Sequence, residues 1–154
     1  MNTNVRSIAY PIDGEQSETG IARRSIIAFC CRECAYAAAD ASASARTPLP
    51  PSVRLVLIPC TGRVSVLHLV GALAEGADGV MVAGCMEGQC HYREGNLNAA
   101  DRVTFVQRML EAVGVEPERV RMFKVSAGEP QKMAAAMREM DRLIRSLNPL
   151  PRAC

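Results

Sequence analysis

The stretch Ser25-Ile-Ile-Ala-Phe-Cys30 is a short apolar run typical of a buried parallel strand. Two similar runs follow at Val53-Arg-Leu-Val-Leu-Ile58 and Gly79-Val-Met-Val-Ala-Gly84, and a fourth strand is expected from Arg121 to Val125. The long connections between these runs favour parallel pairing, since antiparallel neighbours need only short turns.

Helical patterns occupy the connections. The four helices are expected over residues 35–43, 66–74 and 99–113, and from about Pro130 to Leu147. Ser65 is a suitable N-cap for the second helix and Asn98 for the third, which Gly114 should end. The segment Ser126-Ala-Gly-Glu129 has the pattern of a capping box ahead of the fourth helix.

Strand and helix alternate four times, which predicts an α/β domain. We expect an open, mostly parallel sheet of about four strands with flanking helices and right-handed crossovers, in a flavodoxin-like layout. The length of 154 residues suits one domain. Residues 1–24 are polar and broken by Pro11 and Gly14, so the expected division is a flexible N-terminal extension (1–24), a domain (25–148) and a C-terminal tail (149–154).

Composition excludes several classes of function. A net charge of +2 and the absence of Trp argue against a nucleic-acid-binding protein. The first residues lack the apolar core of a signal peptide, and no apolar run reaches the roughly 18–20 residues that span a bilayer. We therefore expect a cytoplasmic protein without direct membrane insertion, whose thiols stay reduced.

The cysteines carry most of the functional signal. Five of the seven come directly after predicted strands, in turn-like segments: Cys31, Cys34, Cys60, Cys85 and Cys90. Because the carboxyl ends of parallel strands share one edge of a sheet, where ligands bind in open α/β folds, these five should converge on a metal or cluster site. Cys30 should point into the core as a small hydrophobe, and Cys154 receives no role.

All-thiolate sites favour zinc or iron–sulfur clusters. A four-thiolate zinc site usually has two Cys-x-x-Cys pairs, whereas this chain has one, Cys31-Arg-Glu-Cys34. The remaining spacings of 26 residues (34 to 60), 25 (60 to 85) and 5 (85 to 90) fit a cluster held by several loops. Five candidates compete for four ligand positions, and spacing leaves open which one is spare.

Other residues near the cysteines are candidates for the surroundings of the site. His91 directly follows Cys90 and is expected as an outer hydrogen-bond donor rather than a ligand. Arg63 and Arg93 flank the cysteine loops, where they would offset negative charge or contact an acidic partner. Gly84 and Gly88 allow the backbone to approach closely.

These segments resemble the delta subunit of methyl-viologen-reducing hydrogenase. The matching stretches are Ile26 to Asp40, Ile58 to Val64, Gly76 to Asn96 and Arg119 to Glu129. The block from Gly84 to Asn96 is the most specific of them, and together they cover roughly residues 26–147. The chain departs from the family pattern at Glu33, where an aromatic residue is usual, and at Ala37-Ala-Ala39, where a glycine is usual.

The resemblance implies a [2Fe–2S] cluster, with the family's cysteines falling on Cys31, Cys34, Cys60, Cys85 and Cys90. It implies an electron relay between a redox module, such as a hydrogenase or formate dehydrogenase, and a heterodisulfide-reductase-like FAD/iron–sulfur protein. Such complexes often bifurcate electrons in anaerobic metabolism.

Two other functions stay open from the sequence. A free-standing thiol–disulfide oxidoreductase could use Cys31 and Cys34 at a helix start, and a zinc-stabilised adaptor could use the same thiolates. No Ser-His-Asp set, phosphate-binding loop or dinucleotide fingerprint occurs, so no catalytic residues are assigned and no substrate-converting site is expected.

Overall fold

The computed structural model of the chain describes residues 24–151. The expectations for residues 1–23 as a flexible extension and for Cys154 lie outside the described residues.

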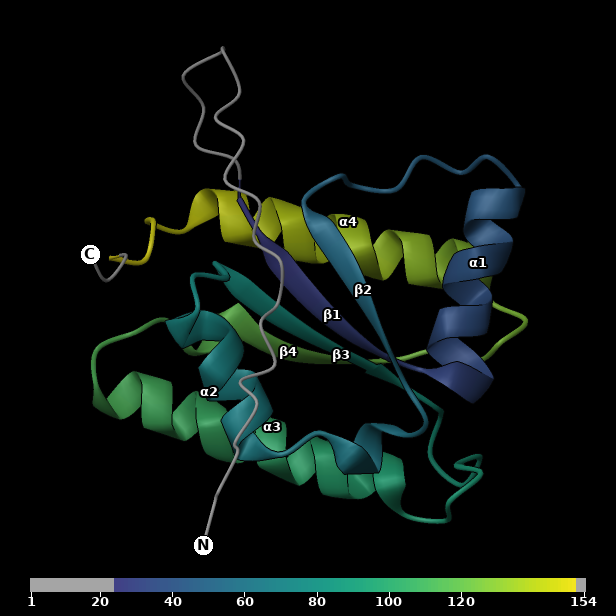
Figure 1. Cartoon of the computed structure of the whole chain (residues 1–154), viewed down its shortest axis with the longest axis horizontal. Coiled ribbons are helices and arrows are strands. Elements are labelled where there is room, and N and C mark those ends of the chain that lie inside the picture. The colour runs from purple at the N-terminus through teal and green to yellow at the C-terminus, as the bar shows by residue number, and fades with distance from the viewer. Residues whose placement is uncertain (1–23, 152–154) are drawn as a thin grey trace, which may run out of the picture.

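The described residues form one four-stranded sheet whose strands are all parallel (Figure 1). The strands are β1 (Ile26–Cys31), β2 (Val53–Ile58), β3 (Gly79–Gly84) and β4 (Val120–Lys124), in the order β2-β1-β3-β4. The predicted α/β class and the open parallel sheet are confirmed. The central strands β1 and β3 are buried along their whole length, which is why their sequences are continuous apolar runs.

Two helices cover each face of the sheet. The helices are α1 (Ala37–Ser44), α2 (Val66–Ala74), α3 (Gly95–Ala112) and α4 (Pro130–Ser146). In Figure 1, α1 and α4 lie on one side of the sheet and α2 and α3 on the other. Two separate clusters of buried apolar residues match these layers, since one contains Met133 and Met137 of α4 and the other contains Leu69 of α2 and Val106 of α3. Met133 and Met137 are therefore core residues.

The structure corrects some predicted helix ends. The third helix begins at Gly95 rather than Ala99, because Gly95 and Asn96 are buried and tertiary contacts extend it, so Asn98 is not its cap. Gly114, with φ of 76°, follows its end as predicted. Ser65 is confirmed as the cap of α2, since its hydroxyl accepts a hydrogen bond from the His68 N–H.

The connection after β1 also differs from the prediction. Cys31 is the last residue of the strand rather than part of the turn. A π-helical turn, η1 (Arg32–Tyr36), then precedes α1 and contains Cys34. Such turns are rare and often mark functional sites.

A buried polar network lies at the amino end of the sheet. The guanidinium of Arg119 is 1% exposed and donates hydrogen bonds to the carbonyl of Asp78 and to the carboxylate of Glu116. Asp78 in turn accepts hydrogen bonds from the Ser25 N–H and from Arg24. These contacts fix the start of β1 and β3, at the end of the sheet opposite the cysteines.

Candidate metal centre

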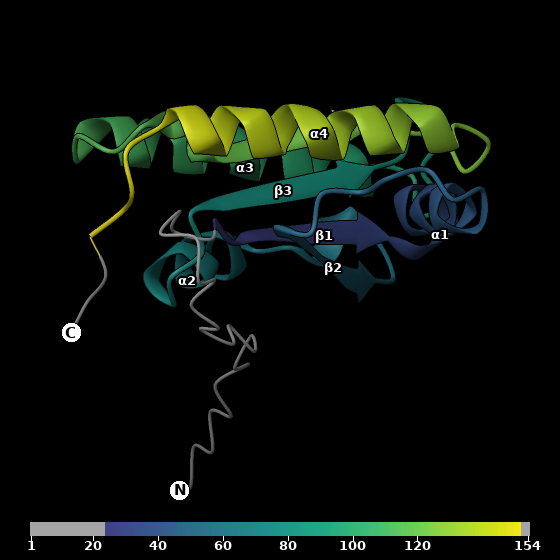
Figure 2. The ribbon, with the colours of Figure 1, turned by 90° about the horizontal axis from the view of Figure 1, so that it is seen from above.

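Three parallel strands deliver the cysteines to one edge of the sheet. The arrowheads of β1 and β2 point to the end of the molecule where α1 lies (Figure 2). Cys31 ends β1, Cys60 follows β2 and precedes the 3₁₀ turn η2 (Thr61–Arg63), and Cys85 follows β3. The predicted convergence at the carboxyl edge is confirmed by the sulfur positions.

Three of the sulfurs form a buried triad. The Sγ atoms of Cys31, Cys34 and Cys85 all lie within 4.8 Å of one another. The Cys85 and Cys34 sulfurs are 3.1 Å apart and the Cys85 and Cys31 sulfurs 3.8 Å apart. All three residues are no more than 5% exposed. Three convergent thiols can hold a soft metal ion when they lose their protons.

The other two sulfurs form a pair beside the triad. Cys60 Sγ and Cys90 Sγ are 3.8 Å apart. The Gly62 N–H donates to the Cys60 sulfur at 3.4 Å. Cys90 begins a tight turn that closes when the Arg93 N–H donates to the Cys90 carbonyl, and Arg93 has a φ of 69°. A positive φ is uncommon in a non-glycine residue, so this turn is strained.

Each group contains one cysteine whose thiolate is favoured. The pKa of Cys31 is lowered because Cys34 hydrogen-bonds its sulfur, an effect that outweighs burial. Burial opposes ionisation of Cys90, but backbone hydrogen bonds from Tyr92 and Asn96 outweigh it and lower that pKa as well. Burial raises the pKa of Cys60 and of Cys85. Ionisation is therefore easier for one cysteine in the triad and one in the pair than for a free thiol.

Two glycines let the loops approach closely. A Cβ on Gly95 would lie 2.3 Å from Cys60 Sγ and 3.3 Å from Cys90 Sγ. A Cβ on Gly62 would lie 2.8 Å from the Gly95 Cα. The first turn of α3 and the loop after β2 thus touch backbone to backbone, which brings Cys60 beside Cys90.

Asn96 supports the loop that carries Cys85. Its side chain is buried, and Nδ2 donates to the carbonyls of Cys85 at 3.1 Å and Met86 at 2.9 Å. The sequence analysis did not single out Gly95 and Asn96, because it expected this helix to begin only at Ala99. The signal was a glycine at a helix start that has no side-chain cap.

The remaining sequence candidates lie around the site. Cys30 is fully buried, burial raises its pKa to about 12, and its thiol donates to the Ala28 carbonyl, so its predicted place in the core is confirmed. His91 is exposed, and its ring packs edge-on against Tyr92. Arg63 is exposed within η2, three residues after Cys60. The outer roles assigned to His91 and Arg63 stay predictions.

A family profile, described as methyl-viologen-reducing hydrogenase, delta subunit, matches residues 26–148. That span contains all five cysteines of the triad and the pair. The chain belongs to this delta-subunit family. The resemblance drawn from the cysteine segments is confirmed.

Relatives of this delta-subunit chain are named as iron–sulfur subunits of hydrogenases. The chain is 46% identical over 125 residues to the iron–sulfur subunit of the F420-non-reducing hydrogenase vhu of Methanopyrus kandleri, covering 81% of this chain and 95% of the relative. It is also 46% identical over 125 residues to the iron–sulfur subunit of the F420-non-reducing hydrogenase of Archaeoglobus profundus, covering 81% of this chain and 91% of that relative.

A third relative carries the delta-subunit sequence inside a longer protein. This relative is one of the subunits of the ferredoxin/F420H2-dependent CoB-CoM heterodisulfide reductase of Methanosarcina acetivorans, and it is 34% identical over 125 residues. These residues are 81% of this chain but only 16% of the relative. In that protein, the delta-subunit domain is joined covalently to a much larger polypeptide.

The donor set of this delta-subunit chain fits an iron–sulfur group. Five thiols make up the two sulfur groups, and thiolates are the usual ligands of such clusters. Because residue 95 is glycine, no side chain at that position separates the Cys60 and Cys90 sulfurs. Among residues 24–151, no helix is long and apolar enough to cross a membrane.

Proposed function

We propose that this chain holds one [2Fe–2S] cluster and relays electrons inside a multi-subunit oxidoreductase complex. The observation that carries the proposal is the convergence of five cysteine sulfurs, from three strand ends, into a triad and an adjacent pair. Such a cluster takes up and releases electrons at a potential set by its surroundings.

We assign Cys31, Cys34 and Cys85 as three of the four ligands, because their sulfurs are mutually within 4.8 Å. The fourth ligand comes from the pair, Cys60 or Cys90. Each group has a cysteine with a lowered pKa, which favours the thiolates that metals require. Asn96 holds the Cys85 loop and Gly95 admits Cys60 to the site.

The proposed partners are a redox protein, such as a hydrogenase or formate dehydrogenase, and a heterodisulfide-reductase-like FAD/iron–sulfur protein. Two relatives are named as hydrogenase iron–sulfur subunits, which supports the first partner. The relative in which this domain is part of a larger heterodisulfide reductase polypeptide supports the second, since fusion keeps two cooperating domains together. We propose that the complex containing this relay is an electron-bifurcating one.

The structure gives reasons to prefer this relay over the alternatives. Thiol–disulfide exchange needs an accessible thiolate, but Cys31 and Cys34 are 2% and 4% exposed. A zinc adaptor would need four of the same thiolates, and the names of the related subunits state iron–sulfur rather than zinc.

The first test is anaerobic purification with iron and sulfide analysis and absorption spectra before and after dithionite. About two irons and two sulfides per chain, with visible bands that bleach on reduction, are expected for a [2Fe–2S] cluster. One zinc without acid-labile sulfide would support the adaptor, and a colourless protein with disulfide reductase activity would support the thiol enzyme.

Single Cys→Ala variants then test the ligand assignment. C31A, C34A and C85A should each lose most of the iron, and one of C60A and C90A should keep it. C30A is the matched control, because Cys30 is a buried core thiol that should not affect iron content. Full iron in C31A, C34A or C85A would overturn the assignment. The double variant C85A/C90A should abolish electron flow while the partner proteins keep their separate activities.

A further inference from the structure

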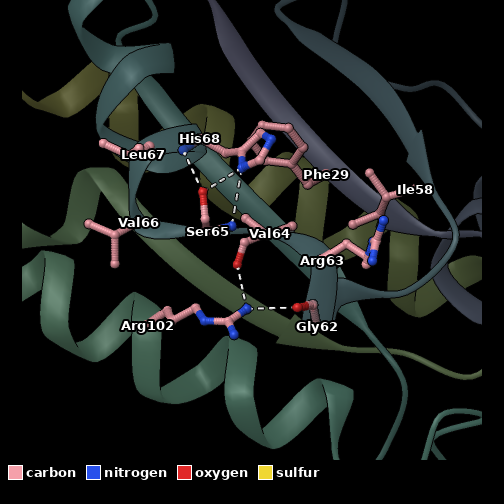
Figure 3. A pocket seen from close by; sticks show the side chains of 10 residues that line it. All are labelled: Phe29, Ile58, Gly62, Arg63, Val64, Ser65, Val66, Leu67, His68 and Arg102. Atoms are coloured by element: carbon pink, nitrogen blue, oxygen red, sulfur yellow. Dashed lines mark hydrogen bonds between the residues drawn. The ribbon is translucent and has the colours of Figure 1, made fainter.

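A surface pocket lies directly beside the Cys60 loop. It has a volume of about 700 Å³ and is lined by ten residues from β1, the end of β2, the η2 loop, the start of α2 and α3 (Figure 3). Its apolar wall includes Ile58, Val64 and Val66, and Leu67, which also lines it, is 82% exposed. An exposed leucine beside an apolar pocket is a feature of protein contact surfaces.

The pocket carries positive charge without a compensating acid. Its ten described lining residues include Arg63 and Arg102 but no Asp or Glu. Among the described residues, neither arginine takes part in an ion pair. The first turn of α2, from Ser65 to His68, also lines the pocket and adds the positive end of a helix dipole.

The two arginines have different roles in this pocket. Dashed lines in Figure 3 join the guanidinium of Arg102 to the carbonyls of Gly62 and Val64, at 2.7 and 2.8 Å. Arg102 therefore holds the η2 loop against α3. Arg63 is exposed and its guanidinium forms no hydrogen bond to another described residue, so its charge is available to a ligand.

The pocket lies next to the loop that carries Cys60. Arg63 is three residues from Cys60, and Gly62, which lines the pocket, donates its N–H to the Cys60 sulfur. A protein bound in the pocket would thus cover the loop that carries Cys60. Electron transfer needs such proximity between the redox centres of two proteins.

We propose that this pocket is the docking site for an acidic side chain, flanked by an apolar one, on the heterodisulfide-reductase-like protein. The inference rests on the proposed function, and it takes this partner because one relative carries the delta-subunit domain within a heterodisulfide reductase polypeptide. Arg63 binds the partner's carboxylate, and Leu67 with the apolar wall buries its apolar neighbour. The positive charge steers the partner toward the Cys60 side of the cysteine site.

The test compares R63E and L67S with R142E in the full chain. Arg142 lies on α4, on the opposite face of the sheet, and is an exposed side chain, so R142E makes the same charge change away from the pocket. The probe is the purified heterodisulfide-reductase-like protein of the same host, and its dissociation constant and association rate are measured at low and high salt. Iron content and bleaching by dithionite are measured for every variant.

We expect R63E to weaken binding by roughly tenfold or more, slow association and reduce its salt dependence. L67S should weaken binding without changing that salt dependence, and R142E should bind like the wild type. Every variant should still contain iron and sulfide and bleach with dithionite, so that weaker binding is not caused by loss of the cluster.

Unchanged affinity in both pocket variants, or no binding by an iron-loaded wild type, would overturn the docking site. If inorganic phosphate protects Arg63 from chemical modification and R63E still binds the partner normally, the pocket is a small-anion site. That result would also overturn the docking site. A wild type without iron and sulfide would overturn the proposed function itself. Because iron content is measured apart from binding, the two failures can be distinguished.

Discussion

The Gly95 backbone lies so close to the Cys60 sulfur that a Cβ at residue 95 would be 2.3 Å from Cys60 Sγ. No real non-bonded contact between carbon and sulfur is that short. The start of α3 and the loop after β2 can therefore meet only if residue 95 is glycine. This contact brings Cys60 within 3.8 Å of Cys90.

Gly95→Ala should displace Cys60 and disturb the cysteine pair. We expect a folded protein with lower iron content or an altered electron paramagnetic resonance spectrum of the reduced protein. Gly71→Ala is the control, since Gly71 lies within α2 with no atom near its missing side chain. That variant should keep its iron and gain about 0.5–1 kcal/mol of stability. Identical spectra for both variants would contradict the role given to Gly95.

Asn96→Ala should loosen the loop that carries Cys85. The change removes the bond that Oδ1 accepts from the Leu97 N–H and the two that Nδ2 donates, so the Cys85 and Met86 carbonyls lose their side-chain donor. We expect a loss of about 1–3 kcal/mol in the free energy of unfolding, measured by urea titration. Asn98→Ala, at an exposed position two residues later, should change it by less than about 0.5 kcal/mol. Equal losses in the two variants would show that the Asn96 bonds are unimportant.

Arg119→Met should destabilise the fold without affecting the metal site. The buried guanidinium bridges Asp78, Glu116 and the chain after α4, at the end of the sheet away from the cysteines. Its removal leaves the buried Asp78 carbonyl without this donor and should cost about 1–3 kcal/mol. Arg121→Met is the matched control, because the Arg121–Glu139 ion pair is exposed and should be worth about 1 kcal/mol or less. A similar melting temperature in both variants would contradict the stabilising role given to the Arg119 network.

Asp141 should contribute to the pH dependence of stability. Burial opposes ionisation of this carboxylate, but hydrogen bonds from Arg145 and Ser52 outweigh it and lower its pKa. Because the folded pKa lies below the unfolded one, the stabilisation is complete above the unfolded pKa. It is lost as the pH falls through the folded value.

Asp141→Asn should therefore lower stability at neutral pH and reduce its loss between about pH 5 and pH 3. Urea unfolding of wild type and variant across this range measures the effect. Parallel stability curves for the two proteins would exclude a contribution from Asp141.

The sequence alone determined the strands, their parallel arrangement and the edge at which the cysteines meet. Strands β1 and β3 are continuous apolar runs because both of their faces are buried, and this signal is local. Parallel topology then places residues that follow different strands at one edge, whatever the details of packing. The core position of Cys30 followed from the same strand pattern, and the family followed from the cysteine blocks.

The division of the five sulfurs into a triad and a pair depends on contacts between elements that are distant in the sequence. Cys31 and Cys85 are far apart in the chain, so the 3.8 Å between their sulfurs depends on the register of β1 against β3. The start of α3 at Gly95, the support from Asn96 and the pocket beside Cys60 depend on packing between elements distant in sequence. Local helix propensity favoured a start later than Gly95. Propensity does not reflect the close backbone contact with the loop after β2, which makes glycine necessary at residue 95.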